Sequence, residues 1–135
     1  MISDPQTPPA PKGIWWTGAI LTGLVTAFLL LNAVMKLLKP EPVVKAFNEL
    51  GWVPGLATLL GIIQLCCLSL YLIPRTSVLG AVLWTGYLGG AIATHVRVGS
   101  PLFSHTLFPV YIAALIWGGL VLRRPAVLRL LFPKD

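Results

Sequence analysis

The feature that most constrains this chain is a run of 22 residues, 14–35, without a single charged side chain. An α-helix rises about 1.5 Å per residue, so about 20 apolar residues are enough to cross the hydrocarbon core of a bilayer. Trp15 and Trp16 stand at the start of the run, where membrane helices carry interfacial aromatic residues. Lys36 and Lys39 follow its end. The run therefore predicts a transmembrane helix.

Three further apolar runs follow, and together they leave too few polar residues to coat a soluble domain. Only 10% of the residues are charged and 56% are hydrophobic, whereas a soluble domain carries about 25% charged residues. We therefore predict an all-α integral membrane protein, a four-helix bundle within residues 14–124. Its spans are expected at about residues 14–35, 54–73, 76–95 and 106–122, between a disordered proline-rich tail, 1–13, and an interfacial basic tail, 125–135.

A short amphipathic segment separates the first two runs. Val43, Phe47 and Leu50 fall on one face of a helix, at i, i+4 and i+7, whereas the charged Lys45 points elsewhere. The segment is too short and too charged to span a bilayer. We therefore expect an interfacial helix over residues 42–50 that lies on the membrane surface.

The distribution of basic residues predicts the orientation. With four spans, both termini and the turn between the second and third spans lie on one side of the membrane. That side carries six basic residues, Lys12, Arg75, Arg123, Arg124, Arg129 and Lys134, and the other side carries four, Lys36, Lys39, Lys45 and Arg97. Cytoplasmic segments carry the excess of lysine and arginine. Both termini are therefore expected in the cytoplasm, with the protein in a bacterial-type inner (plasma) membrane.

Small residues predict how the spans pack. In lipid, helices associate through close backbone approach at small side chains and through shared hydrogen bonds. The third span has Gly86, Gly90 and Thr94 at four-residue spacing, and the second has Gly61. We expect these residues to form contacts within the chain. Gly86 and Gly90 also match the G-x-x-x-G pattern of helix dimers, which leaves a homodimer open.

Polar residues within the spans share the predicted inward faces. Asn32 and Lys36 lie on one stripe of the first span, and Gln64 lies on the matching stripe of the second. An amide or ammonium group that faces lipid is costly, so these side chains should point into the bundle. The candidate ligand-binding residues gather toward the outward-facing end of the bundle and are Asn32, Lys36, Gln64, His95, Arg97 and Tyr111.

These residues also have a purely structural interpretation. Asn32 and Gln64 are polar residues of the kind that link membrane helices by hydrogen bonds, and this role is the more frequent one. Lys36 and Arg97 suit side chains that extend to the lipid headgroups. A ligand site is therefore a hypothesis, favoured because the polar residues converge on one end of one bundle.

No catalytic residue is predicted. No carboxylate occurs between Glu49 and Asp135, although acid–base chemistry and proton transfer inside membranes depend on such groups. His95, His105 and Glu49 have metal-binding atoms, but their spacing matches no metal motif, so no metal site is predicted. The basic residues form no stripe with interleaved aromatic residues, and nucleic acid is not an expected partner. We do not expect an enzyme that acts on its own.

Several segments of the chain resemble the DoxX-like family of small membrane proteins. The clearest is GAVLWTGYLGGAIATHVRVG, residues 80–99, preceded by LGIIQLCCLSLYLIPRTSVLGA and, earlier, by MKLLKPEPVVKAFNELGW. A fourth similar segment is FPVYIAALIWGGLVLR. The order of Lys36, the short helix, the Pro-Arg-Thr turn and the Gly-Gly…His segment is more specific than any one of them. The likeness covers residues 14–124.

The resemblance implies a four-helix membrane bundle and says little about activity. Relatives include a subunit associated with thiosulfate and quinone redox chemistry, and others linked to protein assembly in membranes. Members of the family often carry a glutamate near the middle of the second helix, where this chain has Gln64. That difference argues against proton transfer at this position.

These observations favour a non-catalytic membrane subunit with an outward-facing pocket for a hydrophobic small molecule, either a quinone or a lipid, and with no cofactor of its own. Membrane lipid is the expected partner. One alternative is a membrane-protein assembly or interaction factor. Another is the accessory subunit of a quinone-linked oxidoreductase, which would need a separate redox protein as its partner.

Overall fold

The computed structural model describes residues 11–53 and 55–133, which form helices and no strands. In chain order the elements are α1 (Lys12–Leu38), α2 (Glu41–Glu49), α3 (Leu56–Leu72), η1 (Pro74–Thr76), α4 (Ser77–Arg97), η2 (Leu102–Thr106), α5 (Phe108–Arg123) and α6 (Ala126–Leu131). The predicted proline-rich tail lies outside the described residues as far as residue 10, and α1 already begins at Lys12.

Three helical stretches are long and apolar enough to cross a membrane by length and composition: Lys12–Leu38, Pro74–Arg97 and Leu102–Arg123. The sequence predicted four. The remaining long helix, α3, is equally apolar but has only 17 residues. It ends at Leu72 because Pro74 cannot continue the helix and instead begins the short turn η1.

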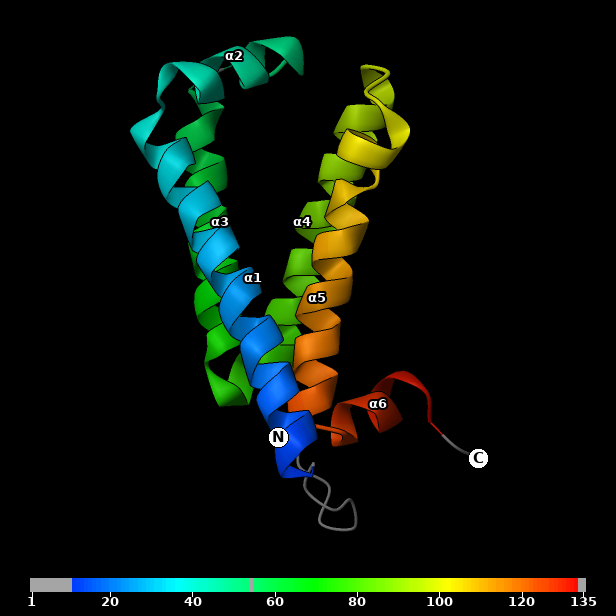
Figure 1. Cartoon of the computed structure of the whole chain (residues 1–135). Helices are drawn as coiled ribbons and strands as arrows, with labels where there is room; N and C mark the ends of the chain where they lie inside the picture. The colour runs from blue at the N-terminus through cyan, green and yellow to red at the C-terminus, as the bar shows by residue number, and fades with distance from the viewer. Residues whose placement is uncertain (1–10, 54, 134–135) are drawn as a thin grey trace.

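The four long helices form two arms that meet at one end and diverge at the other (Figure 1). α1 and α3 make one arm, and α4 and α5 make the other. Helix α1 packs on α3 and α5, and α4 packs on the same two helices, so the four close into a ring. We call the end that carries η1 and the start of α1 the closed end. The opposite end, with α2 and η2, is the open end (Figure 1).

Glycines allow the arms to approach closely toward the closed end. A Cβ atom at Gly18 of α1 would lie 2.8 Å from Leu122 Cβ of α5, and one at Gly119 would lie 2.6 Å from Thr22 Oγ1. A Cβ at Gly80 of α4 would overlap the backbone of Tyr71 in α3. The Tyr71 hydroxyl in turn donates a 2.7 Å hydrogen bond to the backbone carbonyl of Ile116, which ties the two arms together.

The two glycines of α4 that were predicted to pack, Gly86 and Gly90, line the space between the arms instead. A Cβ at Gly86 or at Gly90 would have no neighbouring atom within 4 Å. The expectation that these two residues form helix contacts is therefore wrong, because the arms have already diverged at this height and both glycines border open space. Gly61 does pack as expected, against the backbone carbonyl of Ala33 and the side chain of Leu37.

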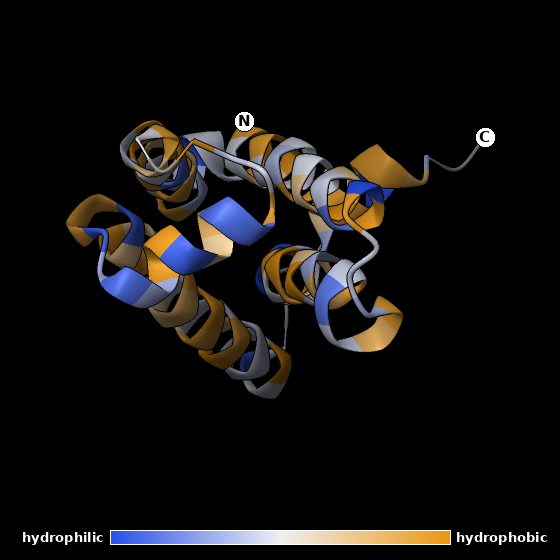
Figure 2. Ribbon diagram, turned by 90° about the horizontal axis from the view of Figure 1, so that it is seen from above, coloured by the Kyte–Doolittle hydropathy of each residue, from blue (hydrophilic) through white to orange (hydrophobic). Residues whose placement is uncertain are grey.

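The inward faces agree with the sequence pattern, and the outward faces are apolar. Gly18, Thr22 and Leu29 are buried on α1, and Gln64 and Tyr71 are buried on α3. The outer surfaces of the long helices carry many exposed large apolar side chains, and orange, apolar stretches recur along these helices in Figure 2. A surface of this kind matches lipid rather than water.

Candidate functional site

A cavity of about 720 Å³ lies between the two arms at the open end. This volume is within the usual range of small-molecule sites, about 300–1,000 Å³. Its lining comes from every long helix and from α2 and η2, and it includes Phe28, Leu29, Asn32, Met35, Lys36, Val43, Phe47, Trp52, Leu60, Gln64, Gly86, Leu88, Gly90, Thr94, His95, Ser104, His105, Phe108 and Ile112. Most of these residues are apolar, so the cavity suits a hydrophobic occupant.

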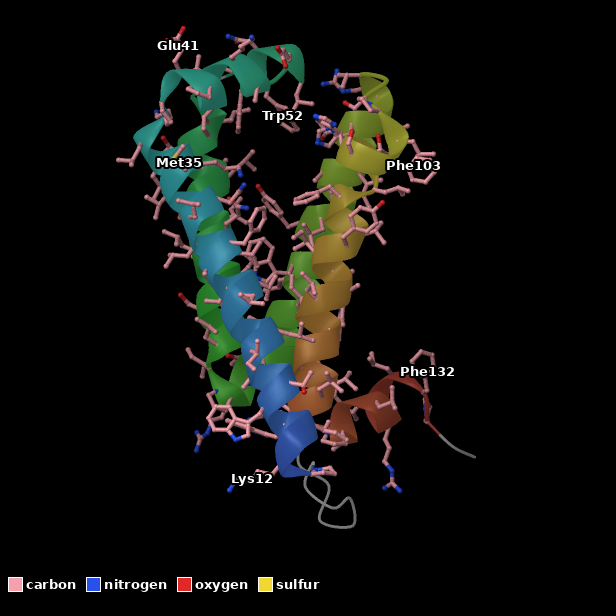
Figure 3. All side chains as sticks on the ribbon, in the orientation of Figure 1. Lys12, Met35, Glu41, Trp52, Phe103 and Phe132 are labelled. Atoms are coloured by element: carbon pink, nitrogen blue, oxygen red, sulfur yellow. The ribbon has the colours of Figure 1, made fainter. Side chains whose placement is uncertain are left out.

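Helix α2 covers the mouth of the cavity. It lies across the open end in Figures 1 and 2, and its apolar face supplies Val43 and Phe47 to the lining. Phe47 is buried, whereas Lys45 on the other face is exposed, as the amphipathic pattern predicted. Trp52, just after α2, also lines the cavity, and Figure 3 shows it beneath α2, facing the space between the arms.

Three polar side chains form a connected group on the α1–α3 wall, which we call the polar trio: Asn32, Lys36 and Gln64. Asn32 Oδ1 accepts a hydrogen bond from Lys36 Nζ and another, 3.1 Å long, from Gln64 Nε2. Lys36 lies one helical turn after Asn32, and Gly61 lets α3 approach α1 one turn before Gln64. Small residues and helical spacing thus bring the trio together.

The ammonium group of Lys36 determines the orientation of both amides. An ammonium has donors only, so Asn32 must present its oxygen to Lys36 rather than its NH₂ group. Because Asn32 Oδ1 also faces Gln64, Gln64 must present its NH₂ group in return. Gln64 Oε1 is therefore turned away from Asn32. This oxygen is buried and has no hydrogen-bond partner among the described residues, and Gln64 itself is only 3% exposed and lines the cavity.

Two histidines line the opposite wall. His95 at the end of α4 and His105 in η2 stand edge to face, with ring centroids 5.9 Å apart. His95 Nδ1 lies 3.0 Å from Ser100 Oγ, and His105 Nδ1 lies 2.8 Å from Ser104 Oγ. Among residues 11–53 and 55–133 no group of three or more metal-binding side chains comes together. The pair instead offers two hydrogen-bonding rings to the cavity.

Four of the six sequence-predicted site residues line the cavity, and two do not. Tyr111 of α5 is 45% exposed, and its hydroxyl donates a 3.2 Å hydrogen bond to the carbonyl of Phe103. Arg97 donates instead to the backbone carbonyl of Leu50, at the end of α2. Its role in the structure is thus to connect the arm α4–α5 to the helix that covers the cavity.

Several cavity residues were missing from the predicted site. His105 was expected near the same end of the bundle but was not among the candidate ligand-binding residues. Ser104 and Trp52 lie in connecting segments whose course the sequence pattern does not determine. Gly86 and Gly90 were assigned to helix packing. The five-residue π-helical turn η2, which places Ser104 and His105 on the cavity wall, has no apolar periodicity that would predict it.

The hydrogen bond of Arg97 predicts how α2 is held in place. Replacing Arg97 with alanine should raise the hydrogen-exchange rate of the amides at residues 50–53 by about fivefold, because an exposed charged hydrogen bond contributes roughly 1 kcal/mol. Exchange measured by mass spectrometry in lipid nanodiscs tests this expectation. Arg75→Ala, an exposed arginine at the closed end, is the control. Equal exchange rates at residues 50–53 in the wild type, Arg97→Ala and Arg75→Ala would show that Arg97 does not hold α2 in place.

The fold and the cavity define a helical membrane protein with a candidate site at the open end of its helices. The chain belongs to the DoxX-like family, which matches residues 20–119. The resemblance noted in the sequence is thereby confirmed. Comparisons with curated proteins and with solved structures found no match.

Proposed function

We propose that this DoxX-like protein is a non-catalytic subunit of the inner membrane whose cavity binds a hydrophobic small molecule, a quinone or a lipid. The polar head of the ligand contacts Asn32, Lys36 and Gln64, with His95 on the facing wall. The single observation that carries this proposal is a connected, partly buried group of polar side chains that lines an apolar cavity of ligand size.

We further propose that α3 is a fourth span and that α2 lies at the membrane interface. A helix of 17 residues is about 26 Å long, at the lower limit of transmembrane helices. Helix α3 packs along both α1 and α4, which are long enough to cross. It also connects the open end, where α1 finishes, to the closed end, where α4 begins (Figure 1). Helix α3 therefore crosses the same thickness of bilayer as α1 and α4.

The orientation follows from the same distribution of basic residues. The closed end carries Arg75, Arg123 and Arg124, and α6 adds Arg129 nearby. The positive-inside rule then favours the closed end in the cytoplasm and the open end, with its cavity, on the outer side. A ligand would reach the site from the outer half of the bilayer.

The test is whether a small molecule remains bound through purification and depends on the polar residues. Native mass spectrometry of the full chain in mild detergent should reveal a bound amphiphile. In the variant Lys36→Met/Gln64→Leu/His95→Phe its occupancy should fall at least about tenfold, because two or more hydrogen bonds of roughly 1 kcal/mol each are lost. The variant Lys45→Met/Asn48→Leu, on the exposed face of α2, should retain the ligand.

Other outcomes favour the other functions. Unchanged occupancy in the triple variant would contradict the proposed site. A defined protein partner recovered by crosslinking in membranes, with no small molecule bound, would favour an assembly factor. A redox protein recovered in the same way would favour an accessory subunit of a quinone-linked oxidoreductase.

A further inference from the structure

Among the described residues, the cavity lining includes the positive charge of Lys36 and no carboxylate. Lys36 contributes the ammonium group and bonds only to the neutral Asn32. Within the described residues the carboxylates are those of Glu41 and Glu49, both on exposed positions of α2. Neither lines the cavity or forms an ion pair with Lys36. A partly buried charge of this kind is costly unless a partner of opposite charge accompanies it.

The polar trio also has more donors than acceptors left over. Lys36 Nζ has three donors and uses one, and the NH₂ group of Asn32 forms no hydrogen bond. Gln64 uses one of its two N–H donors. Against these stands one unused buried acceptor, Gln64 Oε1. A ligand that satisfies the group must supply several acceptor oxygens and one donor.

Resting on the proposed function, we infer that the ligand is an amphiphile whose headgroup is anionic and carries a hydroxyl group. The anionic oxygens face Lys36 and the NH₂ group of Asn32, and the hydroxyl donates to Gln64 Oε1. The attached apolar chain contacts the apolar lining, including Leu29, Leu60, Leu88 and Ile112. Phosphatidylglycerol, with two chains, and lysophosphatidylglycerol, with one, both have this chemistry.

Simpler headgroups leave part of the site unsatisfied. A neutral carbonyl ligand accepts hydrogen bonds but leaves the charge of Lys36 unbalanced. A carboxylate or a phosphate diester without a hydroxyl balances the charge of Lys36. It still leaves Gln64 Oε1 buried without a donor, and a buried acceptor without a hydrogen bond is more costly than one that accepts a hydrogen bond. A zwitterionic phosphocholine headgroup brings a second positive charge into a cavity that already has one.

The test compares four lipids on the full chain in detergent, with bound lipid counted by native mass spectrometry. Phosphatidylglycerol should bind about tenfold more tightly than phosphatidylcholine, because it has a net negative charge for Lys36. It should bind about fivefold more tightly than phosphatidylmethanol, which has the same charge but no hydroxyl. Lysophosphatidylglycerol, which has the same headgroup, compared with phosphatidylglycerol then distinguishes a one-chain from a two-chain ligand.

Variants assign each preference to its residue. Lys36→Met should abolish the preference for phosphatidylglycerol over phosphatidylcholine, and Lys36→Arg should keep it because the charge remains. Gln64→Glu adds a carboxylate of the same shape beside Asn32. This carboxylate supplies the negative charge that Lys36 lacks, so the variant should also lose the preference for phosphatidylglycerol over phosphatidylcholine. Lys45→Met removes one positive charge from the exposed face of α2 and should bind as the wild type does. Thermal unfolding of each variant verifies that it is folded.

The outcomes separate this inference from the proposed function. Tight binding of all four lipids with equal affinity, or a preference that survives both Lys36→Met and Gln64→Glu in folded protein, overturns the inference but leaves the cavity as a lipid site. Preference for phosphatidylcholine overturns it as well. If none of the four binds and no amphiphile co-purifies, the proposed function fails together with the inference.

Discussion

Gly80→Ala should lower the stability of the protein more than the same substitution at any other glycine of α4. A Cβ at this position would overlap the backbone of Tyr71 in α3, and backbone atoms cannot move aside as a flexible side chain can. The helices α3 and α4 must then separate beside the fully buried Tyr71, whose hydroxyl bonds to Ile116. Overpacking of a core typically costs about 1–3 kcal/mol, and a clash with backbone lies at the upper end, about 3 kcal/mol.

The control is a glycine in the same helix with free space around it. A Cβ at Gly89 has no neighbour within 4 Å, and the residue does not line the cavity. Gly89→Ala should leave stability unchanged or raise it by up to about 1 kcal/mol, because alanine has a higher helix propensity than glycine. Thermal unfolding in the same detergent compares the two variants. Similar unfolding temperatures for both would mean that α3 and α4 are not packed at Gly80.

Filling the cavity from α4 should remove the ligand without harming the fold. In Gly86→Phe/Gly90→Phe, two aromatic rings would stand one helical turn apart on the cavity wall, where neither glycine has a neighbour within 4 Å of its Cβ position. Each ring would occupy space that is otherwise open to a ligand, so bound amphiphile should fall at least about tenfold, a loss of 1.4 kcal/mol or more. Every hydrogen bond of the polar trio is retained.

Occupancy measured by native mass spectrometry, together with the unfolding temperature, tests this expectation. Gly89→Phe is the matched control, since it adds the same ring to the same helix outside the cavity. It should keep the ligand. A double variant that stays folded and still retains the full amount of amphiphile would show that the ligand binds somewhere other than between the arms.

Much of the architecture could be predicted because it depends on local composition. The charge-free runs locate α1, α3, α4 and α5, and the proline after α3 explains why this helix is short. Spacing along α1 and α3 predicted their inward faces correctly, including Asn32 and Gln64, because a helical repeat determines which side chains share a face. The amphipathic face of α2 followed from the same geometry.

The candidate site could be predicted only in part. His95 and the polar trio line the cavity as the pattern indicated, whereas Tyr111 and Arg97 do not. Their sequence positions placed them at the correct end of the bundle, but a position along the helix axis leaves the direction of the side chain undetermined. Arg97 reaches α2, and Tyr111 reaches a carbonyl in η2.

The sequence by itself determined that this chain forms apolar helices suited to lipid, that the chain belongs to the DoxX-like family, and which faces of α1 and α3 are buried. Only the tertiary structure decided that the arms meet at Gly18 and Gly80 and part again before Gly86. Glycine has the same local preference at all three positions. Whether it allows close packing or leaves a cavity depends on the distance to the neighbouring helix, which is a property of the crossing of the arms and not of any one segment.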